Sequence, residues 1–258
     1  MPYQIPSILD MLKAGVHFGH QSNRWHPKMA PFIFTERNGV HIFDLEKTQA
    51  KLAEVLEYIK SAAAQNRTFL FVGTKEQAKP IVKKYAEEAN VPYITERWMG
   101  GLLTNFDEIH QTLFKKYKKL KGLKETGEIS KYTKKEQIHL MKDLDKMDQY
   151  LGSVEKMDKK PDIIFIVDLK IDKTAFAEAQ KTGIKIVAFC DSNTNPENVD
   201  YPIPANDDAT NSLDLIIKLV AEAIKDGRAN AVVAAPEVKV NAVPEVKRKE
   251  SVTKVFSE

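Results

Sequence analysis

The chain has 258 residues, of which 43% are hydrophobic, and a formal net charge of +3. It contains no run of eighteen or more apolar residues and no basic segment followed by an apolar one near residue 1, so we expect a soluble cytosolic protein without a membrane span or a secretory signal. Its single cysteine, Cys190, excludes an internal disulfide and is expected to be a small buried residue rather than a nucleophile.

The N-terminal part predicts a short helix, a hairpin and a longer helix. Ser7 is a suitable cap for the short helix, and a turn is expected at residues 15–19. Residues 32–43 read as two apolar strands joined at Asn38-Gly39, a pair that favours the left-handed backbone of a tight turn. Asp44 caps the next segment, in which apolar residues recur at helical spacing and predict an amphipathic helix.

From residue 68 onward, strand patterns and helix patterns alternate. Strands are expected at 68–72, 91–95, 163–167 and 186–189, and helices at 74–89, 173–181 and 213–224, the first with Thr74 and Gln77 as its capping box. Apolar strands separated by amphipathic helices indicate a parallel sheet covered on both faces. The predicted fold class is therefore α/β, a Rossmann-like layered parallel sheet formed by residues 1–105 and 161–227.

Residues 106–160 interrupt this domain and contain no strand pattern. Apolar residues step by three and four over 109–123, and a second seam over 140–154 follows a cap at Thr133. Two such seams joined by a turn predict an inserted antiparallel coiled-coil helical hairpin that projects from the α/β body. Residues 228–258 hold few large apolar side chains and are expected to form a flexible tail.

Two segments combine arginine, tryptophan and glycine. Residues 15–28 read GVHFGHQSNRWHPK, and residues 97–106 read RWMGGLLTNF. Arginine offers bidentate contacts to phosphate and a planar face for stacking, while Trp and Phe offer surfaces for unpaired bases, so both segments suit RNA. The alternative is that the tryptophans are buried and the glycines form structural turns.

A run of lysines without an acidic residue lies on the first helix of the predicted hairpin. Like charge along one helix repels itself unless counter-charge arrives, and a phosphate backbone supplies that charge. The alternative is that the run is only the solvated face of a coiled coil. The six lysines are Lys115, Lys116, Lys118, Lys119, Lys121 and Lys124.

A layered α/β core also invites a nucleotide-enzyme interpretation. The sequence contains neither a Gly-x-Gly-x-x-Gly after a strand nor a Walker loop with its Gly-Lys-Ser/Thr. The turn Val72-Gly73-Thr74-Lys75 could bind an anion at its amides, although a purely structural turn is the simpler interpretation. The fold alone therefore does not predict catalysis.

Histidines and carboxylates suggest a metal site. His17 and His20 could join Asp191, Asp207 and Asp208, which fall in loops expected at the carboxyl ends of later strands. Imidazoles combined with carboxylates suit zinc or a similar transition ion. The alternative is that these side chains hydrogen-bond the loops together or face RNA.

Four separated motifs resemble, in order, the bacterial-type family of ribosomal small-subunit protein S2. They are GVHFGH at 15–20, RWMGGLLTNF at 97–106, PDIIFIVD at 161–168, and DSN at 191–193 with PANDDA at 204–209. The resemblance covers about residues 1–227. It implies a structural constituent of the small ribosomal subunit that supports translation, binds small-subunit rRNA and neighbouring ribosomal proteins, and needs neither catalytic residues nor a cofactor. It also implies the coiled-coil insertion and a position where protein S1 is recruited.

On this resemblance, rRNA recognition falls to the two arginine-tryptophan segments, and the lysines of the hairpin add charge-driven affinity. Two other classes of function stay open. One is a metal-dependent hydrolase that uses His17, His20, Asp191 and Asp207, and the other is a free-standing coiled-coil adaptor. The residues expected to recognise rRNA are Arg24, Trp25, Lys28, Arg97, Trp98 and Asn105.

Overall fold

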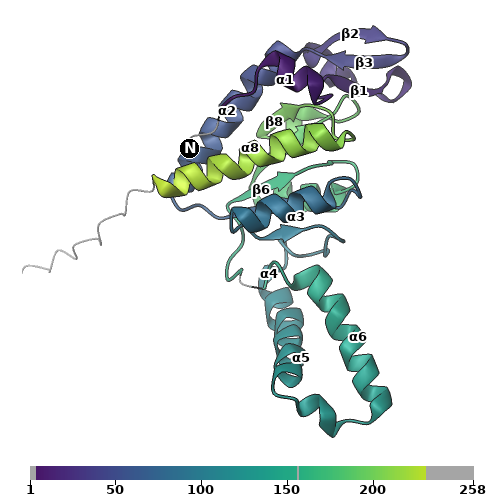
Figure 1. Ribbon diagram of the computed structural model, residues 1–258, viewed down its shortest axis with the longest axis vertical. Helices are drawn as coiled ribbons and strands as arrows, with labels where there is room; N and C mark the ends of the chain where they lie inside the picture. Colours follow the sequence, from purple (N-terminus) through teal and green to yellow (C-terminus); the bar gives the residue numbers. More distant parts are fainter. Residues whose placement is uncertain (1–3, 156, 231–258) are drawn as a thin grey trace, which may run out of the picture.

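The computed structural model describes residues 4–155 and 157–230. Its centre is a five-stranded parallel sheet in the order β5-β4-β6-β7-β8 (Figure 1). The predicted α/β class with a Rossmann-like parallel sheet is therefore confirmed. The strands are β4 (Phe69–Val72), β5 (Tyr93–Ile94), β6 (Ile163–Ile166), β7 (Lys185–Cys190) and β8 (Tyr201–Pro204).

The two faces of the parallel sheet bury different layers. Every residue of β4 and β6 is buried, which explains why both strands read as continuous apolar runs. Alternate residues such as Phe71 and Phe165 pack with three helices, whereas their neighbours Leu70 and Ile164 pack with α7 and the segment after β5. The three helices on the first face are α2 (Leu45–Ala64), α3 (Lys79–Glu88) and α8 (Thr210–Ala229), and α7 spans Lys173–Thr182.

A smaller antiparallel sheet with the order β1-β3-β2 stands beside α1 (Ile8–Lys13), at the end of the molecule away from the helical insertion (Figure 1). Asn38 and Gly39 have φ values of 54° and 74°, as the predicted tight turn requires. The predicted turn is present at residues 14–17, but the sequence did not predict β1, which begins directly after it. Its Gly19 passes so close to the loop after β7 that a Cβ would lie 2.8 Å from Ser192 Oγ. The strands are β1 (Phe18–Gln21), β2 (Ile33–Arg37) and β3 (Val40–Phe43).

Two further expectations are corrected by the structure. Strand β8 was missed because it contains Pro202 and Pro204, yet it lies at the edge of the sheet, where proline is tolerated. The capping box at Thr74 was wrong, since α3 begins at Lys79. The Thr74 hydroxyl instead donates to Asp172 Oδ1 at 2.8 Å. Asp172 is buried, and a buried carboxylate is costly unless it receives hydrogen bonds.

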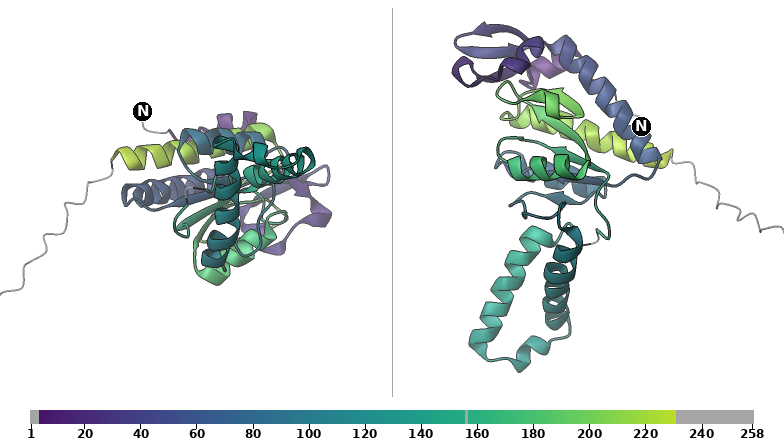
Figure 2. Two further views of the ribbon diagram at one scale, coloured as in Figure 1. Left: turned by 90° about the horizontal axis from the view of Figure 1, so that it is seen from below. Right: turned by 180° about the vertical axis from the view of Figure 1, so that it is seen from behind.

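The insertion forms two helical segments that extend from the body side by side (Figures 1 and 2). The Tyr117 hydroxyl donates to Asp148 Oδ1 at 2.5 Å, and Lys121 Nζ lies 2.7 Å from Glu155 Oε2. The Thr133 amide donates to Glu136 Oε2 at 2.9 Å and begins the second segment. We call this part the arm. It consists of α4 (Phe106–Ile109), a π-helical stretch (His110–Phe114), α5 (Lys115–Glu125), a 3-10 turn (Glu128–Lys131) and α6 (Lys134–Leu151).

The predicted tail began at residue 228, but α8 continues to Ala229, and residues 231–258 lie outside the described residues. Among the helices that are described, none combines the length and the apolar character needed to cross a bilayer.

Candidate nucleic-acid interface and candidate metal centre

The loop of residues 97–105, between β5 and α4, is built around one buried carboxylate. Trp98 Nε1 donates to Glu178 Oε1 at 3.0 Å, and the backbone amides of Gly101 and Leu103 donate to the same carboxylate at 2.7 and 3.0 Å. Burial alone would raise the pKa of Glu178, but these donors outweigh it and lower the pKa below its usual range. The loop therefore has a fixed shape set by α7.

The structure places Trp98 in the alternative environment that the sequence left open, a buried one. The side chain is only 8% exposed and belongs to the hydrophobic core under the sheet. Its one polar atom is already bonded to Glu178, so the residue stabilises the loop from inside.

The outer side of the same loop remains available to a partner. Arg97 and Asn105 are exposed, and a Cβ at Gly100 would meet no atom within 4 Å. Gly101 has a φ of 91°, a conformation that only glycine adopts without strain. A shallow pocket of about 270 Å³ is lined by residues 97–100 together with Tyr150 of the arm. This surface thus adjoins the root of the arm.

The first arginine-tryptophan segment lies elsewhere: its residues 18–21 form β1 of the three-stranded sheet, and Arg24 and Trp25 follow that strand. Trp25 is 38% exposed, and its ring centroid lies 5.0 Å from that of His41. Arg24 and Lys28 are exposed, and Lys28 forms an ion pair with Glu197. The two segments that look alike in the sequence are therefore not brought together.

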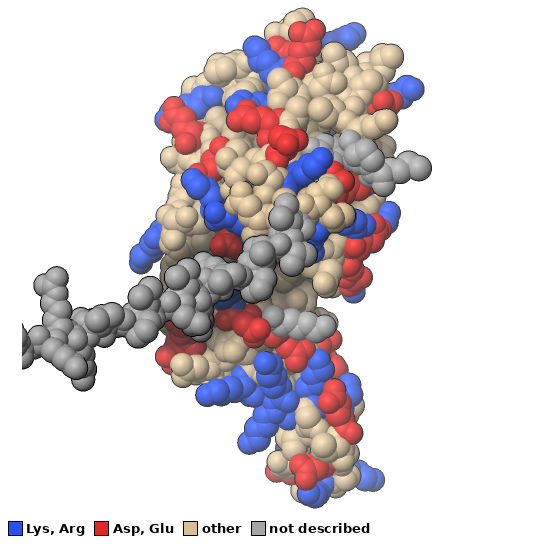
Figure 3. All heavy atoms as spheres, turned by 90° about the vertical axis from the view of Figure 1, so that its left-hand side faces the viewer, with Lys and Arg blue, Asp and Glu red and all other residues tan. Residues whose placement is uncertain are grey.

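Five of the six predicted lysines on α5 are exposed, and Figure 3 shows basic side chains gathered along one side of the arm. Lys121 is the exception, because it is half-buried and forms an ion pair with Glu155, which raises its pKa through that hydrogen bond. The exposed members are Lys115, Lys116, Lys118, Lys119 and Lys124.

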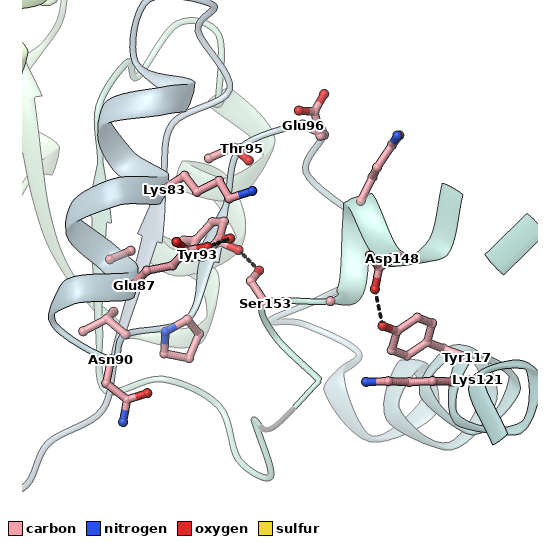
Figure 4. A pocket seen from close by; sticks show the side chains of 15 residues that line it. Lys83, Glu87, Asn90, Tyr93, Thr95, Glu96, Tyr117, Lys121, Asp148 and Ser153 are labelled. Atoms are coloured by element: carbon pink, nitrogen blue, oxygen red, sulfur yellow. Dashed lines mark hydrogen bonds between the residues drawn. The ribbon is translucent and has the colours of Figure 1, made fainter. Parts of the chain in front are cut away.

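A crevice of about 740 Å³ separates α3 and β5 from the root of the arm (Figure 4). Its walls carry both acidic and basic side chains, including Lys83 and Glu87. The Ser153 hydroxyl donates to the carbonyl oxygen of Tyr93, so it is engaged by the backbone rather than by a base. The crevice thus resembles a junction between two parts of the fold more than a catalytic cleft.

Four of the five predicted metal ligands do come together at the carboxyl edge of the parallel sheet. His20 arrives from β1, Asp191 follows β7, and Asp207 follows β8. One possible ligand atom of each lies within 4.8 Å of the others. His20 Nε2 also lies 3.6 Å from Asp208 Oδ2.

His17 does not join this group and is a correction to the prediction. Its ring packs against Phe18 with centroids 4.0 Å apart, and burial lowers its pKa. His17 lies in the turn before β1 and His20 lies within the strand, and of the two only His20 belongs to the group of possible ligands.

Lys75 is the functional neighbour that the sequence did not reveal. Its Nζ lies 2.7 Å from both Asp207 Oδ1 and Asp208 Oδ1, and 3.4 Å from Asp168 Oδ2. Burial would lower the pKa of Lys75, but these carboxylates raise it. The turn at 72–75 was considered for anion binding, and its lysine is instead held by the protein's own acids. The available signal was a lysine after one strand and acids after three others, since these ends meet at one edge.

The charged groups at this edge shift one another's pKa values. Burial, together with Asp191 and Asp168, raises the pKa of Asp207 to about 7, although Lys75 opposes this shift. Asp191 is fully buried and accepts hydrogen bonds from the Ser192 hydroxyl at 2.9 Å and from the Asp207 amide at 3.3 Å. The place where α/β sheets commonly bind substrates is thus occupied by side chains of this chain.

Comparisons with known proteins agree with the sequence motifs. The family model described as Ribosomal protein S2 matches residues 11–227. The chain is 48% identical to small ribosomal subunit protein uS2 of Coprothermobacter proteolyticus, over 87% of this chain and 83% of that protein. The uS2 proteins of Helicobacter hepaticus (46% identity, 86% and 84% covered) and Flavobacterium psychrophilum (48%, 86% and 84%) are similarly close.

Proposed function

The chain belongs to the ribosomal protein S2 family, and from this premise we propose that it binds small-subunit rRNA through the lysine face of its arm. As a member of that family it is a structural, non-enzymatic constituent of the small ribosomal subunit that binds rRNA and other ribosomal proteins and supports translation. In this proposal residues 1–105 and 161–227 form the body, and the inserted segment 106–160, which contains the arm, reaches the rRNA.

The observation that carries the proposal is the contrast between Lys121 and its neighbours. In the part of the chain that the structure describes, Lys121 has an acidic partner within ion-pair distance, whereas Lys115, Lys116, Lys118 and Lys119 have none. Such exposed charge on one side of a projecting element favours a polyanion, because phosphate contacts release condensed counterions. The exposed surface at Arg97 and Asn105 lies at the root of this arm and supplies polar groups for shape recognition.

The test replaces Lys115, Lys116, Lys118 and Lys119 with alanine in the full chain and measures binding to small-subunit rRNA at several salt concentrations. The slope of log affinity against log salt should fall by roughly 3, since each lost phosphate contact removes about 0.7–0.9. A matched variant removes the same charge from α6, at Lys134, Lys135, Lys142 and Lys146.

Equal slopes for the α5 variant and the parent would contradict the lysine face as the rRNA contact. Co-sedimentation of the parent with small subunits through a high-salt cushion tests the family role separately, so the two failures can be told apart. The α6 variant should retain most of the parent's slope, because α6 carries acidic residues such as Asp143 and Asp145 between its lysines, whereas residues 115–124 carry none. An equal loss in both variants would mean that net charge, rather than the α5 face, determines binding.

Protein S1 is a finer partner within the proposal, and the cytoplasm is the proposed site of action. The helix α1 supports a protein contact because Ile8, Leu9 and Leu12 are 40%, 66% and 48% exposed. Leu9→Ser with Leu12→Ser should reduce the recovery of S1 with small subunits while leaving incorporation of this chain intact. Unchanged S1 recovery would exclude this face as its docking site.

A further inference from the structure

We infer that His20, Asp191 and Asp207 bind one zinc ion, with Asp208 orienting the imidazole, and that the ion fastens β1 to the carboxyl edge of the parallel sheet. The inference concerns a site remote from the proposed lysine face, so it goes beyond the proposed function. The ion has a structural role and takes no part in a reaction.

The first support is the geometry of His20 and Asp191. His20 Nδ1 lies 3.0 Å from Asp191 Oδ1. Two ligands bound to the same tetrahedral zinc at about 2.0–2.1 Å lie roughly 3.3 Å from each other. The two atoms are therefore spaced like ligands of one ion, and an atom of Asp207 lies within 4.8 Å of both.

The second support is a shortage of positive charge. Four carboxylates converge here, from Asp168, Asp191, Asp207 and Asp208, and Asp191 and Asp207 are 0% and 1% exposed. Within the described ranges 4–155 and 157–230, the side chains that form ion pairs with them are Lys75 and, when protonated, His20, so two positive charges face four carboxylates. Buried carboxylates are costly unless they are paired or bind a metal, and a divalent ion supplies the missing charge.

The third support is the set of contacts that orient the ligands. Asp208 faces Nε2 of His20 at 3.6 Å, the arrangement of a carboxylate behind a zinc-bound imidazole. Lys75 contacts Oδ1 of Asp207 and of Asp208, so it holds both acids while its ion pairs leave Asp191 to the metal. One imidazole nitrogen with carboxylate oxygens is a donor set that zinc accepts.

The test uses the full chain, stripped with a chelator, given one equivalent of ZnCl₂ and passed through a desalting column. Elemental analysis should find about one zinc per chain, and thermal melting should shift upward with zinc because the ion binds only the folded state. His20→Ala and the isosteric Asp191→Asn should lose the zinc. His17→Ala is the matched control and should keep it, since His17 lies outside the ligand set.

X-ray absorption at the zinc edge on the parent keeps the inference testable even if a variant fails to fold. The expected first shell is one nitrogen with two or three oxygens at about 2.0–2.1 Å. A folded parent that retains no zinc would overturn the inference. So would equal zinc loss from the His17 and His20 variants, or a sulfur-containing first shell.

Discussion

The pairs Arg24-Trp25 and Arg97-Trp98 are identical in sequence but occupy opposite environments in the fold. Trp98 is 8% exposed and lies in the core, whereas Trp25 is 38% exposed and lies beside His41. The difference arises from Glu178, which α7 places under the second loop and which receives the indole N–H. A dipeptide that suits RNA therefore becomes a structural anchor when a distant helix supplies a buried acceptor.

The two segments consequently differ in how their backbone is held. In the 97–105 loop, the amides of Gly101 and Leu103 converge on one carboxylate, so the exposed Arg97 and Asn105 stand on a preorganised frame. In the other segment, the His26 amide donates to Ser192 O at 2.7 Å and leaves the Trp25 ring at the surface. The first segment is rigid with a buried tryptophan, and the second presents its tryptophan.

The largest predicted effect separates the two tryptophans by stability. Trp98→Ala should lower the free energy of unfolding by about 3–5 kcal/mol, because it empties a buried aromatic site. Trp25→Ala should cost less than about 1 kcal/mol. Urea denaturation of both full-length variants measures this, and similar losses in the two would mean that the comparison is wrong.

The next effect concerns the carboxylate beneath the loop. Glu178→Ala leaves buried N–H groups of Trp98, Gly101 and Leu103 without their acceptor and should cost about 2–3 kcal/mol. Glu178→Gln keeps the shape and one acceptor oxygen, and should cost less. If Glu178→Ala lowers the free energy of unfolding no more than alanine at an exposed glutamate such as Glu76, the loop keeps its shape without Glu178.

The same residue predicts a dependence on pH. Because the pKa of Glu178 is lowered on folding, its contribution is complete above the ordinary glutamate pKa of about 4.3 and is lost as the pH falls through the folded-state value. The difference in stability between the parent and Glu178→Gln should therefore shrink in acid. Denaturation midpoints from pH 7 to pH 3 test this, and a gap that stays constant would argue against the ionised carboxylate as the anchor.

The smallest effect on stability should carry the clearest effect on binding. Trp25→Ala should weaken rRNA binding by about 1–3 kcal/mol if its exposed ring stacks on a base. Phe34→Ala is a suitable control, because Phe34 is an aromatic residue that is 74% exposed on β2 of the three-stranded sheet. Filter binding with small-subunit rRNA distinguishes them, and equal losses would assign the effect to general apolar contact.

The sequence could predict the elements whose signals are local. Continuous apolar runs identified β4 and β6, Asp44 marked the start of α2, and Asn38-Gly39 marked the hairpin. Strand β8 was not predicted because it contains prolines, which are tolerated only at the edge of a sheet. A local sequence pattern does not show which strand lies at the edge.

For the candidate sites as well, local signals could be predicted and contacts between distant residues could not. The acids after β7 and β8 could be grouped because parallel strands end at a common edge. Burial of the tryptophans was one of two open alternatives, and the sequence could not show that it applies to Trp98 alone, since its acceptor Glu178 lies 80 residues further along the chain. Lys75 was missed because a lysine at a strand end can bind an external anion as well as a carboxylate of the protein. Only the fold shows that its Nζ contacts Asp207.

The contacts between β1 and the loops after β7 and β8 also determine when the molecule can finish folding. The His20 amide of β1 donates to Ser192 Oγ at 2.7 Å, and the Asn206 amide donates to Val16 O, just before β1, at 3.2 Å. These contacts of the N-terminal part therefore cannot form until the last described strand has been synthesised. Contacts of such long sequence separation form slowly. During translation the three-stranded sheet must remain without its counterpart until the edge strand emerges, and it should be the last part to gain protection from hydrogen exchange.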